Sequence, residues 1–170
     1  MDEIKITECP RDAMQGIKKF IPTEDKIGYL QNLLKVGFDT LDCGSFVSSK
    51  VIPQLKDTGE VIRSLDLTST KTKLLVIVAN LRGAEIACNC DQINYLGFPF
   101  SISENFQIRN VNKTIKESVK EVQSIAEMVD NSNKELVVYL SMGFGNPYGD
   151  PWSPSIVSHW CEKLSDLGVK

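Results

Sequence analysis

The chain has 170 residues, with 19 basic and 22 acidic side chains and a formal net charge of −3. A weakly acidic chain lacks the positive field that grips phosphate backbones, which argues against a nucleic-acid partner. No apolar run approaches the length of a bilayer span, and the first residues lack the basic and apolar regions of a targeting peptide. The five cysteines are an odd number at irregular spacing, which is typical of reduced thiols. We therefore expect one domain over residues 1–170, in the cytoplasm, with no membrane partner.

The first predicted elements are a short strand and an amphipathic helix. Residues 4–8 alternate apolar and polar side chains before a Cys-Pro break, which is typical of a strand. Thr23 is predicted to cap a helix that carries Ile27, Leu30 and Leu34 on one face, the spacing of a helix with one buried side.

The middle of the chain continues this alternation. Residues 38–42 are predicted to form a second strand, and residues 53–65 the helix that follows it. The continuous apolar runs at 74–79 and 136–140 are typical of parallel strands that helices cover on both faces. Between these two runs, residues 92–96 are predicted to form a weaker strand.

The last two predicted helices have clear signals at their N-termini. Thr114 and Glu117 form a capping-box pattern, and an apolar stripe follows over residues 115–129. Ser153 and Pro154 are predicted to open the final helix, because proline suits the first helical position.

The five predicted strands recur at about 33 residues per β-α unit. This alternation predicts an α/β fold with parallel strands in sequential order, either doubly wound or part of a barrel. Eight such units would need about 260 residues, close to the roughly 250 of a (β/α)8 barrel. The chain ends where a sixth strand would begin, which indicates a truncated form.

Polar side chains gather just past the predicted strands, where α/β folds place their chemistry. Two carboxylates, two arginines and several amides at one edge would suit a divalent cation and an anionic, oxygen-rich substrate. The alternative interpretation is that these residues cap helices and solvate loops. They are Arg11, Asp12, Gln15, Asp42, Ser45, Asn80, Arg82, the loop predicted at 99–112 and the segment that begins at Ser141.

Several of these segments resemble the 3-hydroxy-3-methylglutaryl-CoA (HMG-CoA) lyases. The sequence Pro-Arg-Asp-Ala-Met-Gln at 10–15 is similar to the Pro-Arg-Asp-Gly-Leu-Gln signature of that family, and Asp-Cys-Gly-Ser-Phe-Val-Ser at 42–48 to its Glu-Ala-Thr-Ser-Phe-Val-Ser segment. Asn-Leu-Arg-Gly at 80–83 resembles its Asn-Leu-Lys-Gly, and the segment 139–148 its Tyr-x-Ser-x-x-x-Gly-x-Pro-Tyr. The matching segments follow one another in order along the chain.

The resemblance implies a metal-dependent lyase on a (β/α)8 TIM barrel, present here as an incomplete barrel of about five β-α units. Such an enzyme cleaves HMG-CoA, or a related 3-hydroxyacyl-CoA, to acetyl-CoA and a keto acid, which for HMG-CoA is acetoacetate in leucine degradation. It uses Mg2+ or Mn2+ and is a possible homodimer as a full-length protein. The resemblance assigns Asp12 as a metal ligand, Arg11 as the group that stabilises the enolate, and Asp42 to the place of a catalytic glutamate. The residues that it assigns to substrate binding are Gln15, Ser45, Asn110 and Ser141.

Other parts of the family's catalytic machinery lie in later segments, namely a His-x-His metal pair, a proton-donating cysteine and an asparagine ligand. The single histidine of this chain, His159, falls within a predicted helix, where we expect a surface or packed side chain. We therefore expect the 170-residue chain alone to be a poor or inactive lyase. The alternative is a non-catalytic α/β module that keeps the scaffold and binds a ligand or partner without turnover.

Overall fold

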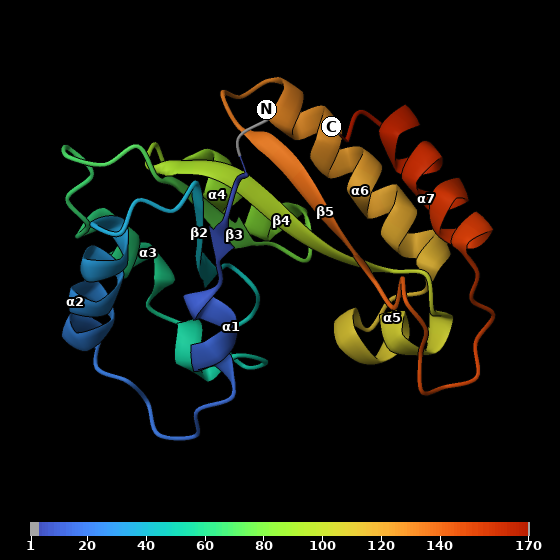
Figure 1. The fold of residues 1–170 in the computed structure, drawn as a ribbon, viewed down its shortest axis with the longest axis horizontal. Coiled ribbons are helices and arrows are strands. Elements are labelled where there is room, and N and C mark those ends of the chain that lie inside the picture. Colours follow the sequence, from blue (N-terminus) through green and yellow to red (C-terminus); the bar gives the residue numbers. More distant parts are fainter. Residues whose placement is uncertain (1–3, 170) are drawn as a thin grey trace.

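The computed structural model describes residues 4–169, which form a single curled sheet with helices around it (Figure 1). Five strands lie in the order β1-β2-β3-β4-β5, and every neighbouring pair is parallel. The predicted fold class, an incomplete barrel of parallel β-α units in sequential order, is confirmed. The strands are β1 (Thr7–Glu8), β2 (Thr40–Ser45), β3 (Lys73–Ile77), β4 (Ile93–Ser101) and β5 (Glu135–Ser141).

Helices follow each strand and divide into two groups (Figure 1). Helices α1 and α5 lie at the end where the strands finish, whereas the other helices lie along the outer face of the sheet. The helices are α1 (Pro10–Gln15), α2 (Thr23–Leu34), α3 (Thr58–Arg63), α4 (Leu81–Cys88), α5 (Glu104–Val111), α6 (Ile115–Asp130) and α7 (Pro154–Asp166), with a short 3-10 turn at Pro53–Leu55.

The core lies between the sheet and the outer helices. Leu74, Val76 and Val78 alternate along β3 and its end toward this layer, and all three are fully buried. Helix α6 packs its predicted stripe, including Val122 and Val129, into the same cluster. Because side chains alternate along a strand, the odd-numbered positions of β3 face the inside of the half-barrel instead.

Gly97 shows how tightly the inside of the half-barrel is filled. A Cβ atom at this position of β4 would lie 2.8 Å from Ile77 Cδ1 and 3.0 Å from both Leu75 Cδ2 and Tyr139 Cε2. The glycine therefore makes room for side chains of β3 and β5 to meet across β4.

The predicted strand limits need three corrections. β1 is shorter than the predicted 4–8, and β2 runs from Thr40 to Ser45 instead of 38–42. β4 was expected to be weak and short, but at nine residues it is the longest strand. Its extension includes Pro99. The backbone of Gly97, two residues earlier, bonds toward β3, where the Gly97 carbonyl accepts from Val78 N. The register between β3 and β4 ends at Ile77 and Gly97, so Pro99, which has no N–H group, lies beyond the residues of β4 that pair with β3.

The helices also differ from the sequence-based expectation. Thr23 is the first residue of α2 and does not cap it, because the helix begins one residue earlier than predicted, with Pro22 at the capping position; the Thr23 hydroxyl donates to Asp57 Oδ2 at 2.8 Å. The predicted helix over 53–65 is divided into the 3-10 turn and α3, and the loop predicted at 99–112 contains the end of β4 and all of α5. The capping box of Thr114 and Glu117 is confirmed, as is the Ser153 cap of α7.

Candidate active site

The carboxyl ends of the strands open into a cavity of about 750 Å³, and most of the predicted site residues line it. One wall comes from α1 and from the segment after β2, and the opposite wall from α5 and the residues that follow it. Six predicted residues are on the lining: Arg11, Asp12, Gln15, Asn80, Asn110 and Ser141.

Arg11 is fixed on this lining by the buried carboxylate of Asp42. The Arg11 Nε atom donates to Asp42 Oδ1 at 3.1 Å, and Nη2 donates to Oδ2 at 2.6 Å. The Arg11 side chain is 14% exposed and that of Asp42 is fully buried. Pro10, at the first position of α1, starts the helix that places Arg11 above the end of β2. This two-point contact fixes the plane and the direction of the guanidinium group.

The remaining guanidinium nitrogen organises the exposed edge of α1. Arg11 Nη1 donates to Asp12 Oδ1 at 3.0 Å and to Gln15 Oε1 at 3.1 Å. The Asp12 side chain is 72% exposed, so its carboxylate is open to the cavity while one oxygen contacts Arg11. The arrangement is a charged cluster in which one arginine touches two carboxylates and an amide.

The charges in this cluster influence each other. Burial raises the pKa of Asp42, and the hydrogen bond and charge of Arg11 act against that increase. Burial lowers the pKa of Arg11, but the hydrogen bond and charge of Asp42 outweigh it and raise the pKa. We take the pair as ionised, because an arginine side chain keeps its proton in proteins.

Tyr139 adds a neutral hydroxyl to the same cavity. It lies on β5, which brings it next to the cluster from the other edge of the sheet. Burial, followed by the charge of Asp42, raises its pKa to about 12. The Tyr139 hydroxyl therefore stays protonated at neutral pH and is a hydrogen-bond donor in the cavity. The sequence pattern quoted Tyr139 only as part of a motif and gave it no role.

Asp42 and Ser45 are not part of the cavity lining. The Ser45 hydroxyl is buried, donates to the Ile77 carbonyl at 3.3 Å and accepts from Val47 N at 3.1 Å. The structure thus places Ser45 at the buried end of β2 and off the lining, whereas the serines on the lining are Ser48 and Ser141. Asp42 reaches the cavity only through Arg11.

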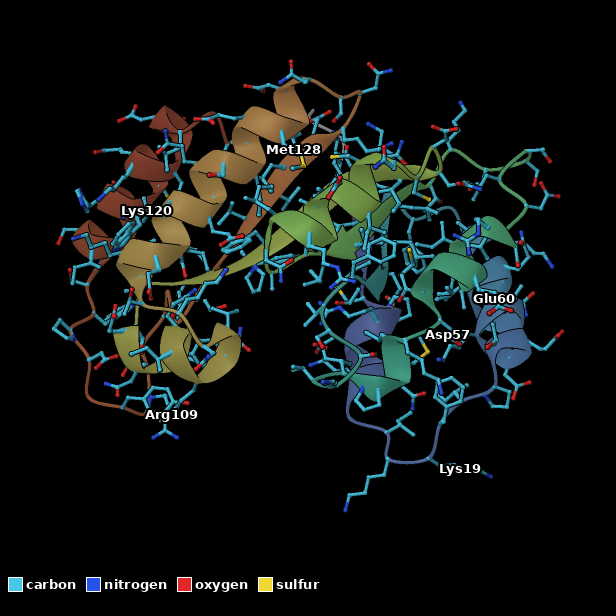
Figure 2. The ribbon with its side chains drawn as sticks, turned by 180° about the vertical axis from the view of Figure 1, so that it is seen from behind. Lys19, Asp57, Glu60, Arg109, Lys120 and Met128 are labelled. Atoms are coloured by element: carbon cyan, nitrogen blue, oxygen red, sulfur yellow. The ribbon has the colours of Figure 1, made fainter. Side chains whose placement is uncertain are left out.

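The wall opposite α1 carries cations that the sequence pattern did not single out. Arg109 on α5 and Lys113, just past it, both line the cavity. Lys113 Nζ pairs with Glu121 Oε2 at 2.5 Å and donates to the Ala79 carbonyl at 3.3 Å. Arg82, which was expected at this edge, is exposed and not on the lining. In Figure 2, Arg109 lies at the same end of the molecule as Lys19, which belongs to the segment between α1 and α2, and the two residues lie on opposite sides of that end.

A metal ion would find one suitable ligand in this cavity. Within residues 4–169, no three histidine, cysteine or acidic side chains come close enough together to hold a metal. Asp12 alone presents an exposed carboxylate, the donor that Mg2+ and Mn2+ prefer.

His159 is exposed on α7 beside Trp160, as predicted for a surface side chain. No helix in the described part of the chain is long and apolar enough to span a bilayer.

Comparisons with known proteins give one consistent result. The chain is 32% identical to a mitochondrial HMG-CoA lyase of Arabidopsis thaliana over 97% of its length, and 30% identical to a cytoplasmic 3-hydroxy-3-methylglutaryl-CoA lyase of Danio rerio over 97%. It covers 35% and 49% of those two proteins, so it spans about a third to a half of their length. No protein-family model matches the chain.

Solved structures agree with the curated relatives. The fold is similar to that of an HMG-CoA lyase from Bacillus subtilis, with a TM-score of 0.91 and 31% identity over 98% of this chain and 56% of that one. An Acinetobacter baumannii HMG-CoA lyase, solved with coenzyme A and 3-methylmalate, gives a TM-score of 0.89 and 28% identity over 97% of this chain and 53% of that one. The resemblance in the motifs is thus confirmed, and the chain is a relative of part of the HMG-CoA lyases.

Proposed function

We propose that this chain forms the arginine-bearing part of an HMG-CoA lyase active site. The reaction is the metal-assisted cleavage of HMG-CoA to acetyl-CoA and acetoacetate. The observation that carries the proposal is the Arg11 cluster: a guanidinium fixed by Asp42, beside the exposed carboxylate of Asp12, on a cavity in a fold similar to that of HMG-CoA lyases.

Arg11 supplies the positive charge for the carbon–carbon cleavage. As that bond breaks, negative charge develops on the thioester oxygen of the acetyl-CoA enolate. A fixed cation at this oxygen stabilises the transition state more than the ground state. Arg11 is suited to this task because it keeps its charge and cannot act as the base. Asp42 contributes through Arg11, as the group that holds the guanidinium in one orientation.

Asp12 is the residue of this chain that would hold the divalent cation, Mg2+ or Mn2+. When bound, the cation supplies a Lewis acid for the tertiary hydroxyl group and the carboxylate of the substrate. The described residues provide one ligand of a complete set, so turnover requires further ligands from outside them.

The opposite wall is suited to the CoA part of the substrate. Asn110 and Ser141 offer polar groups on the lining, together with Gln15 on the α1 side. The related Acinetobacter baumannii enzyme was solved with coenzyme A, which supports an acyl-CoA as the ligand.

The free cysteines among the described residues suit a reducing compartment, and we propose a cytoplasmic location.

A binding experiment with Mn2+ tests the metal part of this proposal directly. Electron paramagnetic resonance of Mn2+ added with HMG-CoA measures how much metal the protein holds. We expect the Asp12→Asn variant to bind Mn2+ more weakly than the wild type, with Asp25→Asn, an exposed aspartate in the first turn of α2, as the matched control. Equal Mn2+ binding by all three proteins would contradict the role of Asp12.

A second candidate is an acyl-CoA-binding module without turnover. The absence of a three-ligand metal cluster within residues 4–169 favours it. Because turnover requires metal ligands from outside the described residues, release of acetyl-CoA from HMG-CoA with added Mg2+ or Mn2+ separates the two functions when it is measured on a protein that contains this chain together with those ligands. Turnover that depends on Asp12 supports the lyase, whereas CoA binding with no turnover supports the module.

A further inference from the structure

The loop between β5 and α7, residues 142–153, folds back onto the start of α5. Asp150 Oδ2 accepts from Ser103 Oγ at 2.5 Å and from Asn105 N at 3.0 Å. Asp150 Oδ1 accepts from Asn105 Nδ2 at 2.6 Å. A single carboxylate thus joins two segments that are more than forty residues apart in the sequence, through hydrogen bonds that its charge strengthens.

Contacts within the loop hold Asp150 independently of α5. Asn146 Oδ1 accepts from Tyr148 N and from Asp150 N, both at 3.0 Å. Asn146 Nδ2 donates to the Asp150 carbonyl at 2.9 Å. The Trp152 indole N–H donates to the Gly143 carbonyl, which ties the two ends of the loop together. The carboxylate of Asp150 is therefore a fixed point to which α5 attaches.

The same loop also contacts the side chains that α5 presents to the cavity. The Tyr148 ring lies 6.4 Å from the Phe106 ring, centre to centre, and the Arg109 guanidinium lies 5.3 Å from the centre of the Tyr148 ring. Phe106 and Arg109 both line the cavity. The loop thus supports α5 at its first turn and again at Arg109, whose side chain extends from the end of the molecule in Figure 2.

We propose that Asp150 is a positioning residue, which fixes α5 so that Arg109 can contact the phosphate groups of CoA. The inference rests on the proposed function for the identity of the ligand. A guanidinium group has the fork geometry that suits phosphate oxygens, and its position follows from the position of α5. Asp150 itself touches no ligand in this arrangement and acts only through the helix.

Hydrogen exchange tests the attachment of α5 without any ligand. We expect Asp150→Ala to speed the exchange of the amide hydrogens at Asn105, Phe106 and Gln107, because the start of α5 loses three hydrogen bonds. Asp150→Asn keeps the shape and one oxygen acceptor, and is expected to have a smaller effect. Asp130→Ala, at the exposed end of α6, is the control. Unchanged exchange of the α5 amides in Asp150→Ala would overturn the inference.

Calorimetric binding of two ligands, well below the unfolding temperature, tests the effect on the cavity. CoA carries the phosphates, and pantetheine is the corresponding thiol without them. We expect Asp150→Ala to weaken CoA binding by about tenfold and to leave pantetheine binding unchanged, with Asp150→Asn restoring part of the affinity for CoA.

The outcomes separate the two proposals. Equal weakening of both ligands, or no weakening of CoA, would overturn the positioning of Arg109 by Asp150. Absence of CoA binding by the wild-type protein would overturn the proposed function and, with it, the phosphate contact. In that case the exchange rates of the α5 amides still decide whether Asp150 holds the helix.

Discussion

Arg11 and Asp42 lie 31 residues apart in the sequence and meet through two side-by-side hydrogen bonds at the mouth of the half-barrel. The pair joins α1 to the end of β2, so a charged group at the surface of the cavity is held by a fully buried one. A buried carboxylate with a single cationic partner makes the site sensitive to any change in either residue.

Asp42→Asn is expected to destabilise the fold by about 2–4 kcal/mol, because it removes the negative charge that compensates Arg11 and leaves N–H donors unpaired. Urea denaturation of the wild type and the variant measures the change in the free energy of unfolding. Asp91→Asn, at an exposed position before β4, is the control and should have no measurable effect. A loss of stability in Asp42→Asn no larger than in this control would contradict the importance of the pair.

Gly97→Ala tests the packing inside the half-barrel. The added Cβ would lie within 3.0 Å of side chains from β3 and β5, and overpacking of this kind costs about 1–3 kcal/mol. Gly28→Ala in α2, where nothing lies within 4 Å of the added atom, should be neutral or stabilising by up to about 1 kcal/mol. Thermal unfolding of both variants checks the pair of expectations, and an equal response of the two would show that the inside of the barrel is loosely packed.

The sequence is sufficient for the order of the strands and for part of the site. The apolar runs at 74–79 and 136–140 mark strands with apolar side chains on both faces, but helices cover only the outer face, and side chains such as Leu75 and Ile77 fill the inside of the half-barrel. The sequence predicts that Arg11 and Asp42 lie close together, because it places each at the end of one of two neighbouring parallel strands. Their hydrogen bonds follow from that topology.

Other features depend on contacts that no local pattern reveals. A register shift at Cys43 allows both Asp42 and Ser45 to face the inside of the barrel, but the Ser45 hydroxyl bonds to the Ile77 carbonyl and does not reach the cavity. The sequence predicts a loop where α5 lies, because this helix has few buried residues of its own. Its start depends on Asp150, which is distant in the sequence.

In an active protein that contains this chain, Arg11→Lys is expected to lower kcat by about 10²-fold. Lysine keeps the positive charge, but it cannot make the two-point contact with Asp42 while also reaching Asp12 and Gln15. Mn2+ binding should be unchanged, because the Asp12 carboxylate is still present. Steady-state kinetics with HMG-CoA and resonance measurements of bound Mn2+ check the two expectations, and a variant with wild-type kcat would refute the role of Arg11 at the enolate.

Tyr139 provides a spectroscopic test of the cavity. The protein has four tyrosines, and a typical tyrosine ionises near pH 10, whereas burial and the charge of Asp42 raise the pKa of Tyr139 to about 12. In a metal-free alkaline titration followed by phenolate absorbance, we expect one late phase that is absent in Tyr139→Phe.

Because the pKa of Tyr139 is higher in the folded protein than in the unfolded chain, the stability linked to its neutral hydroxyl is fully present below about pH 10. It is lost as the pH rises toward 12, so the wild type should lose more stability over this range than Tyr139→Phe. If the titration showed no late phase, Tyr139 would have to be open to water, and its burial in the cavity near Asp42 would be wrong.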